Sequence, residues 1–317
     1  MKKTILFIFL FFSFLANSQT DFSDRWEDFF SYNNVKDFIK VDEVIYAIAD
    51  NAVFIYNTQT NETSKLSSIQ GLSGETTSAI HYNKTFDRLI VGYENGLIEV
   101  IDSDGKITVS ADITGFNITG SKRINDIYEH ENTLYISTPF ALVEYDIDRI
   151  EFGETFLISQ NSSDVFVNET VVINNTIYAA TSTGVYFADI TNPNLIDFNN
   201  WQQIFPSSDF KNITVFNNEI YTIINTSLYR LTGTNTTLIR NFSETINDLK
   251  SSSTHLSIAL NTSVIVLNNT LIEVNQVNQT TEFNFVLNTA FTENNTIFLG
   301  TTEFGVLETS NGNTLMF

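Results

Sequence analysis

The sequence predicts an all-β fold, a seven-bladed β-propeller with four antiparallel strands in each blade. One pattern recurs along the chain: an apolar run, a polar turn with a small residue at its end, and a second apolar run. This pattern is typical of a tight β-hairpin. Successive hairpins lie 36 to 45 residues apart, which is the period of propeller blades, whereas helical repeats would show apolar residues every 3.6 positions. The hairpins are predicted at residues 44–56, 88–100, 133–145, 176–190, 219–231, 255–267 and 296–308.

The segments that flank the hairpins predict the other two strands of each blade. A short apolar segment precedes most hairpins, and we expect it to form the innermost strand, which lines the central channel. Weaker apolar segments follow the hairpins and are expected to form the exposed outermost strand. The inner strands are predicted at residues 35–38, 78–80, 124–127, 213–215 and 246–249, and outer strands at 107–109, 156–158 and 201–204.

The two ends of the propeller are expected to meet in the seventh blade. Residues 26–32 precede the first inner strand and are similar to the outer strand predicted at residues 201–204. We expect this N-terminal strand to join the last blade and close the ring, because closure removes free sheet edges. No linker or shift in composition marks a second domain, so residues 19–317 are predicted to form a single propeller domain.

Residues 1–18 have the features of a secretory signal peptide. Lys2 and Lys3 precede an apolar stretch at residues 5–15, and cleavage is expected after Ser18. A membrane anchor is the less favoured alternative, because the stretch is shorter than the roughly 20 residues that a span needs, and no later segment could span. The chain has no cysteine, which excludes disulfides and lipidated cysteines. We therefore expect an exported bacterial protein of the periplasm or the outer-membrane cell surface.

The charge of the chain limits its partners. Lysine and arginine total 16 against 37 acidic residues, and removal of the signal peptide with Lys2 and Lys3 leaves 14 against 37, a net charge of about −23. Such a surface repels phosphate backbones and anionic bilayers, so no nucleic acid or membrane partner is predicted. This charge is typical of a soluble, monomeric scaffold.

Propeller geometry indicates where a partner would bind. The loop inside a hairpin and the loop that arrives from the previous blade open on the same face of the ring. This geometry places Tyr93, Glu94 and Asn95 close to Lys122 and Arg123, two adjacent basic residues in an acidic protein. We predict these five residues as a partner-binding face. The alternative is that the basic pair is solvated and balances nearby acids.

No catalytic residue, metal site or cofactor is predicted. The chain lacks nucleophile-elbow, Walker, dinucleotide-binding and zinc motifs. Its three histidines, His81, His130 and His255, are expected at solvated turns and do not converge as metal ligands would. Residues 102–105 (D-S-D-G) are similar to the start of a calcium loop but lack the remaining ligands, so a turn is expected there. Acids that converge in the channel leave carboxylate catalysis open, although no pair is indicated.

Three stretches carry a resemblance to a known family. They are G-L-S at residues 71–73, L-I-V-G-Y-E-N-G-L-I-E-V-I at 89–101 and G-S-K-R-I-N-D-I at 120–127. Together they resemble the N-terminal propeller of the PorZ family, surface components of the type IX secretion system. Residues 26–32 and 177–185 fit the same pattern, so the resemblance covers essentially the whole mature chain. More loosely, residues 298–306 are similar to the repeat of periplasmic sensor propellers in hybrid two-component regulators.

The resemblance to the PorZ family implies a non-enzymatic protein of the outer-membrane surface. It implies membership of the attachment complex, with partners of the PorU, PorV and PorQ kind, which joins cargo proteins to anionic lipopolysaccharide. PorZ proteins continue into a second propeller and a β-sandwich domain, so this chain, which ends at Phe317, is expected to be a fragment or a reduced relative. The two alternatives are a ligand-sensing propeller of a hybrid two-component regulator and a secreted carbohydrate-active enzyme.

Overall fold

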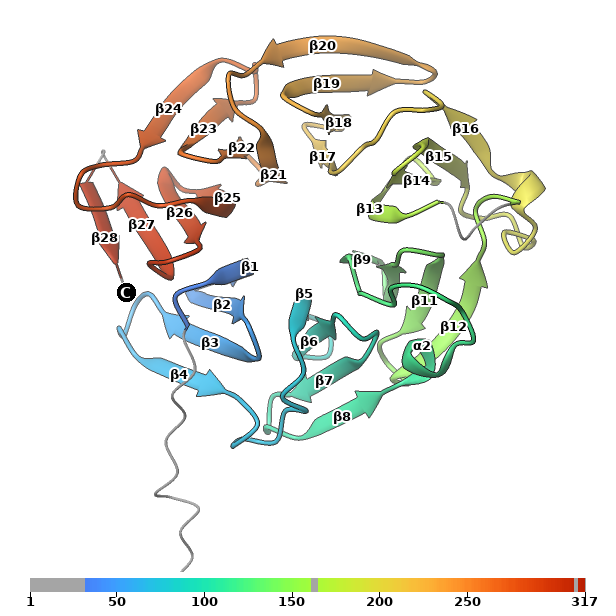
Figure 1. Ribbon diagram of the computed structural model, residues 1–317, viewed down its shortest axis with the longest axis horizontal. Coiled ribbons are helices and arrows are strands. Elements are labelled where there is room, and N and C mark those ends of the chain that lie inside the picture. Colours follow the sequence, from blue (N-terminus) through green and yellow to red (C-terminus); the bar gives the residue numbers. More distant parts are fainter. Residues whose placement is uncertain (1–31, 161–164, 311–312, 317) are drawn as a thin grey trace, which may run out of the picture.

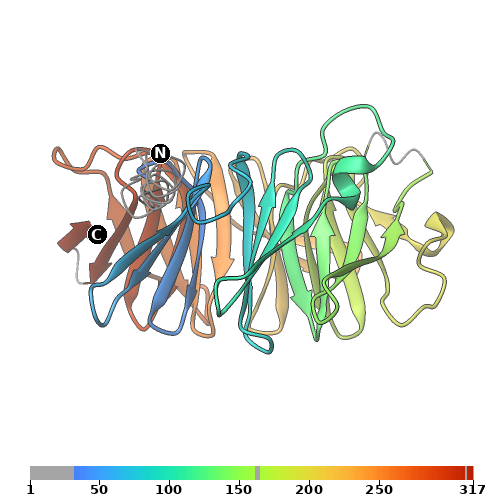
Figure 2. The same cartoon turned by 90° about the horizontal axis from the view of Figure 1, so that it is seen from below.

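The computed structural model describes residues 32–160, 165–310 and 313–316. Seven four-stranded antiparallel sheets stand around a central axis, and one continuous stretch of chain forms each sheet (Figure 1). Seen from the side, the strands run between the two faces of a disc (Figure 2). The predicted all-β fold, a seven-bladed propeller with four antiparallel strands in each blade, is confirmed.

Within each blade the strands pair in the order in which they occur in the chain, from the channel outward. Blade 1 contains β1 (Val35–Val41), β2 (Val44–Ala49), β3 (Ala52–Asn57) and β4 (Thr63–Leu66), and blade 2 contains β5 (Thr77–Asn83), β6 (Arg88–Tyr93), β7 (Ile98–Asp102) and β8 (Ile107–Ser110). Blade 3 contains β9 (Asp126–His130), β10 (Thr133–Ser137), β11 (Leu142–Asp146) and β12 (Glu151–Phe156). Blade 4 contains β13 (Val167–Ile173), β14 (Thr176–Thr181), β15 (Gly184–Asp189) and β16 (Gln202–Ile204). Blade 5 contains β17 (Ile213–Phe216), β18 (Glu219–Ile224), β19 (Ser227–Thr232) and β20 (Asn235–Asn241). Blade 6 contains β21 (Ile246–Ser251), β22 (His255–Leu260), β23 (Ser263–Asn268) and β24 (Glu273–Asn278). Blade 7 contains β25 (Leu287–Glu293), β26 (Thr296–Thr301), β27 (Val306–Ser310) and β28 (Asn313–Met316). Two short helical turns, α2 (Asp112–Gly115) and η4 (Phe198–Asn200), lie in connections between strands.

All seven predicted hairpins occur as the second and third strands of their blades. The outer strands predicted at residues 107–109 and 201–204 correspond to β8 and β16. The prediction at residues 156–158 was wrong in position, because β12 begins at Glu151 and ends at Phe156. Most side chains of β12 are at least partly exposed, so this strand carries no apolar run for sequence analysis to find.

The hydrophobic core lies between blades. Each cluster of buried apolar side chains joins neighbouring sheets, such as Ile90 and Ile98 of blade 2 with Ile136 of blade 3. The approach is close at Gly92, where a Cβ atom would lie 2.7 Å from Cγ2 of Ile124. Burial of these apolar faces is the main force that holds the sheets together as a ring.

Polar contacts near the channel join each blade to the next. In five inner strands, β1, β5, β13, β21 and β25, one extra residue forms a β-bulge near the start of the strand. The side chain of each bulged residue donates a hydrogen bond to a main-chain carbonyl of the following blade, and Asn125, just before β9, does the same. These bonds are Lys36 Nζ to Thr77 (2.9 Å), Ser78 Oγ to Ile124 (2.8 Å), Asn125 Nδ2 to Val167 (2.6 Å), Asn168 Nδ2 to Phe210 (2.7 Å), Asn247 Nδ2 to Leu287 (2.6 Å) and Asn288 Nδ2 to Val35 (2.7 Å).

The closure of the ring differs from the expectation. The outer place in the seventh sheet, which we assigned to residues 26–32, is held by β28, which pairs with β27. The dipeptide Asn311-Gly312 between these strands is strongly favoured in two-residue hairpin loops, and sequence analysis gave it no weight. Residues 26–31 lie outside the described part of the chain. Blades 7 and 1 meet through buried Val306, Phe298 and Phe38 and through a hydrogen bond from Gly305 N to Asn33 O.

The predicted signal peptide, residues 1–18, also lies outside the described residues. In the part of the chain that the structure describes, no helix has the length and apolarity needed to cross a membrane.

Candidate functional site

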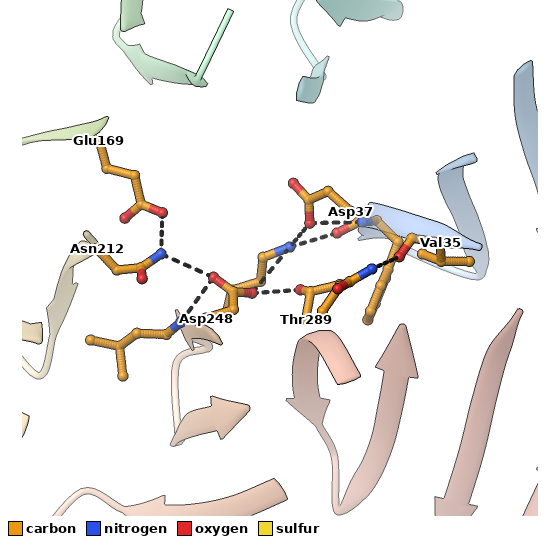
Figure 3. A network of polar contacts seen from close by, with 10 residues as sticks. Val35, Asp37, Glu169, Asn212, Asp248 and Thr289 are labelled. Atoms are coloured by element: carbon orange, nitrogen blue, oxygen red, sulfur yellow. Dashed lines mark hydrogen bonds and ion pairs between the residues drawn. The ribbon is translucent and has the colours of Figure 1, made fainter. Parts of the chain in front are cut away.

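The central channel contains a polar cluster, which we define as Asp37, Asp126, Glu169, Asn212, Asp248, Lys250 and Thr289. Asp37, Glu169, Asp248 and Thr289 directly follow the bulged residue of their inner strands, Asp126 directly follows Asn125, and Asn212 directly precedes β17. A bulge re-aims the side chain that follows it. The four acids Asp37, Asp126, Glu169 and Asp248 border a cavity of about 480 Å³. Figure 3 shows how Asp37, Glu169, Asn212, Asp248 and Thr289 lie relative to one another.

Lys250 is the cation of the polar cluster. It lies two residues after Asp248 on β21, so both side chains point to the same side of the strand. Its ammonium group forms an ion pair with Asp37, donates a hydrogen bond to Phe38 O (2.9 Å) and lies 3.9 Å from Oδ2 of Asp248. It also lies 5.2 Å from the centre of the Phe38 ring, within the range of a cation–π contact. Blades 6 and 1 are therefore linked across the channel.

The carboxylates of the polar cluster are hydrogen-bonded within it. Asp248 accepts hydrogen bonds from Thr289 Oγ1 (2.5 Å), Leu249 N (2.9 Å) and Asn212 Nδ2 (3.3 Å). Glu169 accepts from Asn212 Nδ2 and from Ile213 N (2.8 Å). These bonds reduce the cost of burying charge, because each carboxylate keeps donors that replace water.

Burial dominates the electrostatics of the polar cluster. It raises the pKa of Asp126 to about 7, and the neighbouring charge of Asp37 adds to this effect. Burial raises the pKa of Glu169 well above its usual range, with further contributions from Asp126 and Asp248. The pKa of Asp248 is also raised by burial, although Lys250 opposes the shift. Part of the cluster therefore carries protons near neutral pH.

The pKa of Lys250 shifts upward. Burial acts to lower it, but the carboxylates of Asp37 and Asp248 outweigh this effect and raise the pKa above its ordinary value. Lys250 is therefore charged at neutral pH and is compensated inside the cluster. Among residues 32–160, 165–310 and 313–316, no group of three or more histidine, aspartate or glutamate side chains is arranged to hold a metal ion.

His81 departs from the expectation of a solvated turn residue. It lies within the inner strand β5, its Nε2 atom is 2.7 Å from Oε2 of Glu129, and it borders the channel cavity. Asn83 donates to the other oxygen of Glu129 at 2.8 Å. The prediction was wrong because β5 extends three residues beyond the apolar segment at residues 78–80, and this extension carries alternating polar side chains. His130 ends β9 and His255 begins β22.

The structure brings together the two loops of the predicted partner-binding face. Ile124 N donates to Tyr93 O at 3.1 Å, and Arg123 forms an ion pair with Glu94 at 3.5 Å. Lys122 Nζ donates to Thr114 O at 2.5 Å, and Asn95 accepts a hydrogen bond from Leu97 N at 3.0 Å. We call Glu94, Asn95, Lys122 and Arg123 the loop face.

Tyr93 does not belong to this surface. Its side chain is fully buried, and its hydroxyl group donates a hydrogen bond to the buried carboxylate of Glu99. The assignment failed because Tyr93 ends β6 directly before an exposed turn, and its position in the sequence does not show that it packs against Ile48 and Val53 of the preceding blade.

The sequence predicted the inner strands of five blades, but not β13 or β25 and not the polar cluster. A signal was present: when the inner segments are aligned, V-K-D-F, I-N-D-I and I-N-D-L at residues 35–38, 124–127 and 246–249 share an apolar residue, a hydrogen-bond donor and an acid. The β-bulge at the donor position, which occurs in β1 and β21, is the part that the pattern does not reveal.

Seven sheets around a channel with an internally compensated acidic cluster define the chain as a closed β-propeller. Residues 45–202 match the family model of the PorZ N-terminal β-propeller domain of the type IX secretion system. This part of the chain belongs to that family. Comparison with the curated proteins gives no match.

Solved structures are similar in fold. PorZ from Porphyromonas gingivalis, described as an essential bacterial surface component of the type IX secretion system, has a TM-score of 0.78 and 15% identity over 92% of this chain. The chain spans 39% of that PorZ chain. Raptor from Chaetomium thermophilum gives a TM-score of 0.68 with 10% identity, covering 89% of this chain and 29% of its own. BamB from Moraxella catarrhalis gives a TM-score of 0.55 with 8% identity, and the match covers 89% of this chain and 96% of the BamB chain. At these identities the likeness concerns the fold alone.

Proposed function

We propose that this chain is a non-enzymatic scaffold of the type IX secretion attachment complex, exported to the bacterial outer-membrane surface. The observation that carries the proposal is the family match across residues 45–202. The likeness to the PorZ propeller over 92% of the chain supports it as a matter of fold. The partners would be proteins of the PorU, PorV or PorQ kind.

The loop face is the surface that we propose for these partners. In the channel, the charges of Lys250, Asp37 and Asp248 are already compensated by one another, which leaves little for a ligand to pair with. On the loop face, by contrast, Arg123 and Glu94 keep about two fifths of their side-chain surface exposed. The net charge of −21 disfavours direct binding to anionic lipopolysaccharide, and this favours protein partners.

The test is capture of purified PorU, PorV and PorQ from the source bacterium by the immobilised mature chain. The variant Arg123→Glu places two acids side by side, and we expect it to weaken capture by about tenfold or more. The swapped pair Glu94→Arg with Arg123→Glu separates loss of the local ion pair from loss of partner contacts.

The matched control is Arg149→Glu. Arg149 is also an arginine that forms a surface ion pair, with Asp146 at 3.7 Å, but it lies on the opposite face, in the turn between β11 and β12. Its substitution is expected to leave capture unchanged. Failure of the wild-type chain to retain any of the three proteins would contradict the proposed function.

A further inference from the structure

An apolar groove lies beside the loop face. It encloses about 580 Å³ between the segment after α2, the turn between β10 and β11, and the connection from β12 to β13. Three large apolar side chains that border it are exposed: Phe116 by 41%, Leu157 by 39% and Phe166 by 48%. Soluble proteins seldom gather exposed apolar side chains in one hollow unless something binds there.

The wall of the groove is held in place from below. Ile113 of α2 is buried, and the ring of Phe116 stacks on Phe140 with centroids 5.2 Å apart. Lys122 Nζ donates to Thr114 O at 2.5 Å, and this bond ties the end of the loop back to α2. Figure 2 shows the loop with α2 rising above its neighbours on this face. These contacts fix the side of the groove that α2 and the turn between β10 and β11 form.

The charges around the groove indicate the chemistry of its occupant. Among the residues that the structure describes, none of the side chains that line it is charged. Residues 113–125 include Lys122 and Arg123 but no acid, in a chain with 37 acids and 16 basic residues. Arg123 N donates to Oγ of Ser121, which lines the groove, so the basic pair continues directly from the groove wall. The Nε atom of Arg123 is buried and has no hydrogen-bond partner. The guanidinium group of Arg123 pairs with Glu94 at 3.5 Å, and the Arg123 side chain keeps 43% of its surface exposed. An approaching carboxylate would meet the exposed N–H donors of this group, whereas most of the acidic surface would repel it.

We propose that this groove docks an extended segment of a partner protein in which an aromatic or branched aliphatic side chain is next to a carboxylate. The inference rests on the proposed scaffold function and adds the chemistry of the partner. The apolar side chain covers Phe116, Leu157 and Phe166, and the carboxylate pairs with Arg123. An apolar anchor in a preformed pocket with an arginine at its edge is the usual composition of a binding hot spot.

The first test uses three short labelled peptides and fluorescence anisotropy with the mature chain at physiological ionic strength. In one peptide Phe and Asp alternate, in the second Ser replaces Phe, and in the third Lys replaces Asp. We expect the Phe and Asp peptide to bind, and the Ser peptide to bind at least about tenfold more weakly. Absence of binding by the Phe and Asp peptide up to about 1 mM would overturn the inference.

Two variants locate the binding. The double variant Leu157→Ser with Phe166→Ser removes exposed apolar surface from the groove, and we expect about a tenfold loss for the Phe and Asp peptide. The matched control, Leu238→Ser with Ile272→Ser, removes side chains that are 48% and 62% exposed next to or within the outer strands of blades 5 and 6, and it should bind as the wild type does. Equal losses in both double variants would overturn the assignment to the groove. Since the Lys peptide can bind the acidic surface elsewhere, its binding should not respond to the groove variant.

The second test separates this inference from the proposed function. The same two double variants are used to capture purified PorU, PorV and PorQ. Loss in the groove variant alone supports the inference. If the groove variant captures partners as well as the wild type does, the groove inference fails while the scaffold function stands. If the wild type captures none of them but binds the Phe and Asp peptide in the groove, the scaffold function fails and the groove assignment stands.

Discussion

The raised pKa of Asp126 predicts how stability depends on pH. Its carboxyl group titrates near pH 7 in the folded chain, against an ordinary value of 3.8. Between these values the folded chain binds more protons than the unfolded chain, so this group favours folding as the pH falls toward about 4 and favours it less as the pH rises through about 7. A difference of about three between the folded and unfolded pKa of Asp126 corresponds to about 4 kcal/mol in the free energy of unfolding. This is an upper limit, because partial access to water and relaxation reduce the effect.

The variant Asp126→Asn removes this charge and keeps an oxygen that can accept the backbone hydrogen bonds from Thr170 and Ile127. At pH 8 the wild type carries a poorly solvated carboxylate beside Asp37, so the substitution should raise the midpoint of thermal unfolding. At pH 5 the wild-type side chain is protonated in the folded chain, and the gain should be smaller. The difference between the two gains is up to about 3 kcal/mol, or about 5 °C for a domain of this size.

The assay is thermal unfolding of both proteins at pH 5 and pH 8 and equal ionic strength, followed by the fluorescence of the buried Trp201. The control is Glu151→Gln, which neutralises an exposed acid of β12 and should shift the midpoint equally little at both pH values. A gain for Asp126→Asn that is the same at pH 5 and pH 8 would refute the claim that this carboxyl is strained by burial.

Three further predictions concern the contacts that hold the ring. Lys250→Met should lower the free energy of unfolding by about 2 kcal/mol at pH 8 and by less at pH 5, since burial raises the pKa of its partner Asp248, which gains protons as the pH falls; a larger loss at pH 5 would contradict this. Asn288→Ala should lower the free energy of unfolding in urea by about 1–2 kcal/mol, because Val35 O loses its hydrogen-bond donor from the last blade. Asn235→Ala on the exposed strand β20 should leave this free energy unchanged. Gly92→Ala should cost about 1–3 kcal/mol in thermal unfolding through overlap with Ile124, whereas Gly115→Ala, which meets no atom within 4 Å, should not.

The fold was predictable because its signal is local. Each hairpin places two apolar strands around a short turn, and the period of the hairpins fixes the number of blades. The predicted inner strands β1, β9 and β21 were found because one side of each packs in the core. The outer strand β12 was misplaced because its exposed position does not require apolar residues.

The candidate site was harder to predict because it depends on contacts between blades. Asn125 and Asp126 have the composition of a turn, yet their side chains reach the next blade and the channel. Tyr93 was assigned to the surface because an exposed loop follows it in the sequence, whereas in the fold its side chain is fully buried. Glu94 and Arg123 were placed together correctly, since the geometry of a propeller brings these loops side by side whatever their sequence.

The six hydrogen bonds from the inter-blade positions to main-chain carbonyls all run in one sense, from each donor blade to the one that follows, and the last returns from Asn288 to Val35. Within the described residues each sheet is also assembled from a single stretch of chain, so no described strand is shared between the first and seventh blades. The wheel therefore has no privileged seam. Asn33, just before β1, contacts Gly305 of the seventh blade, and the last strand, β28, belongs to that same blade. A chain whose two ends were linked and which was opened in another inter-blade loop would keep the same neighbouring blades, and its starting point could be moved around the rim.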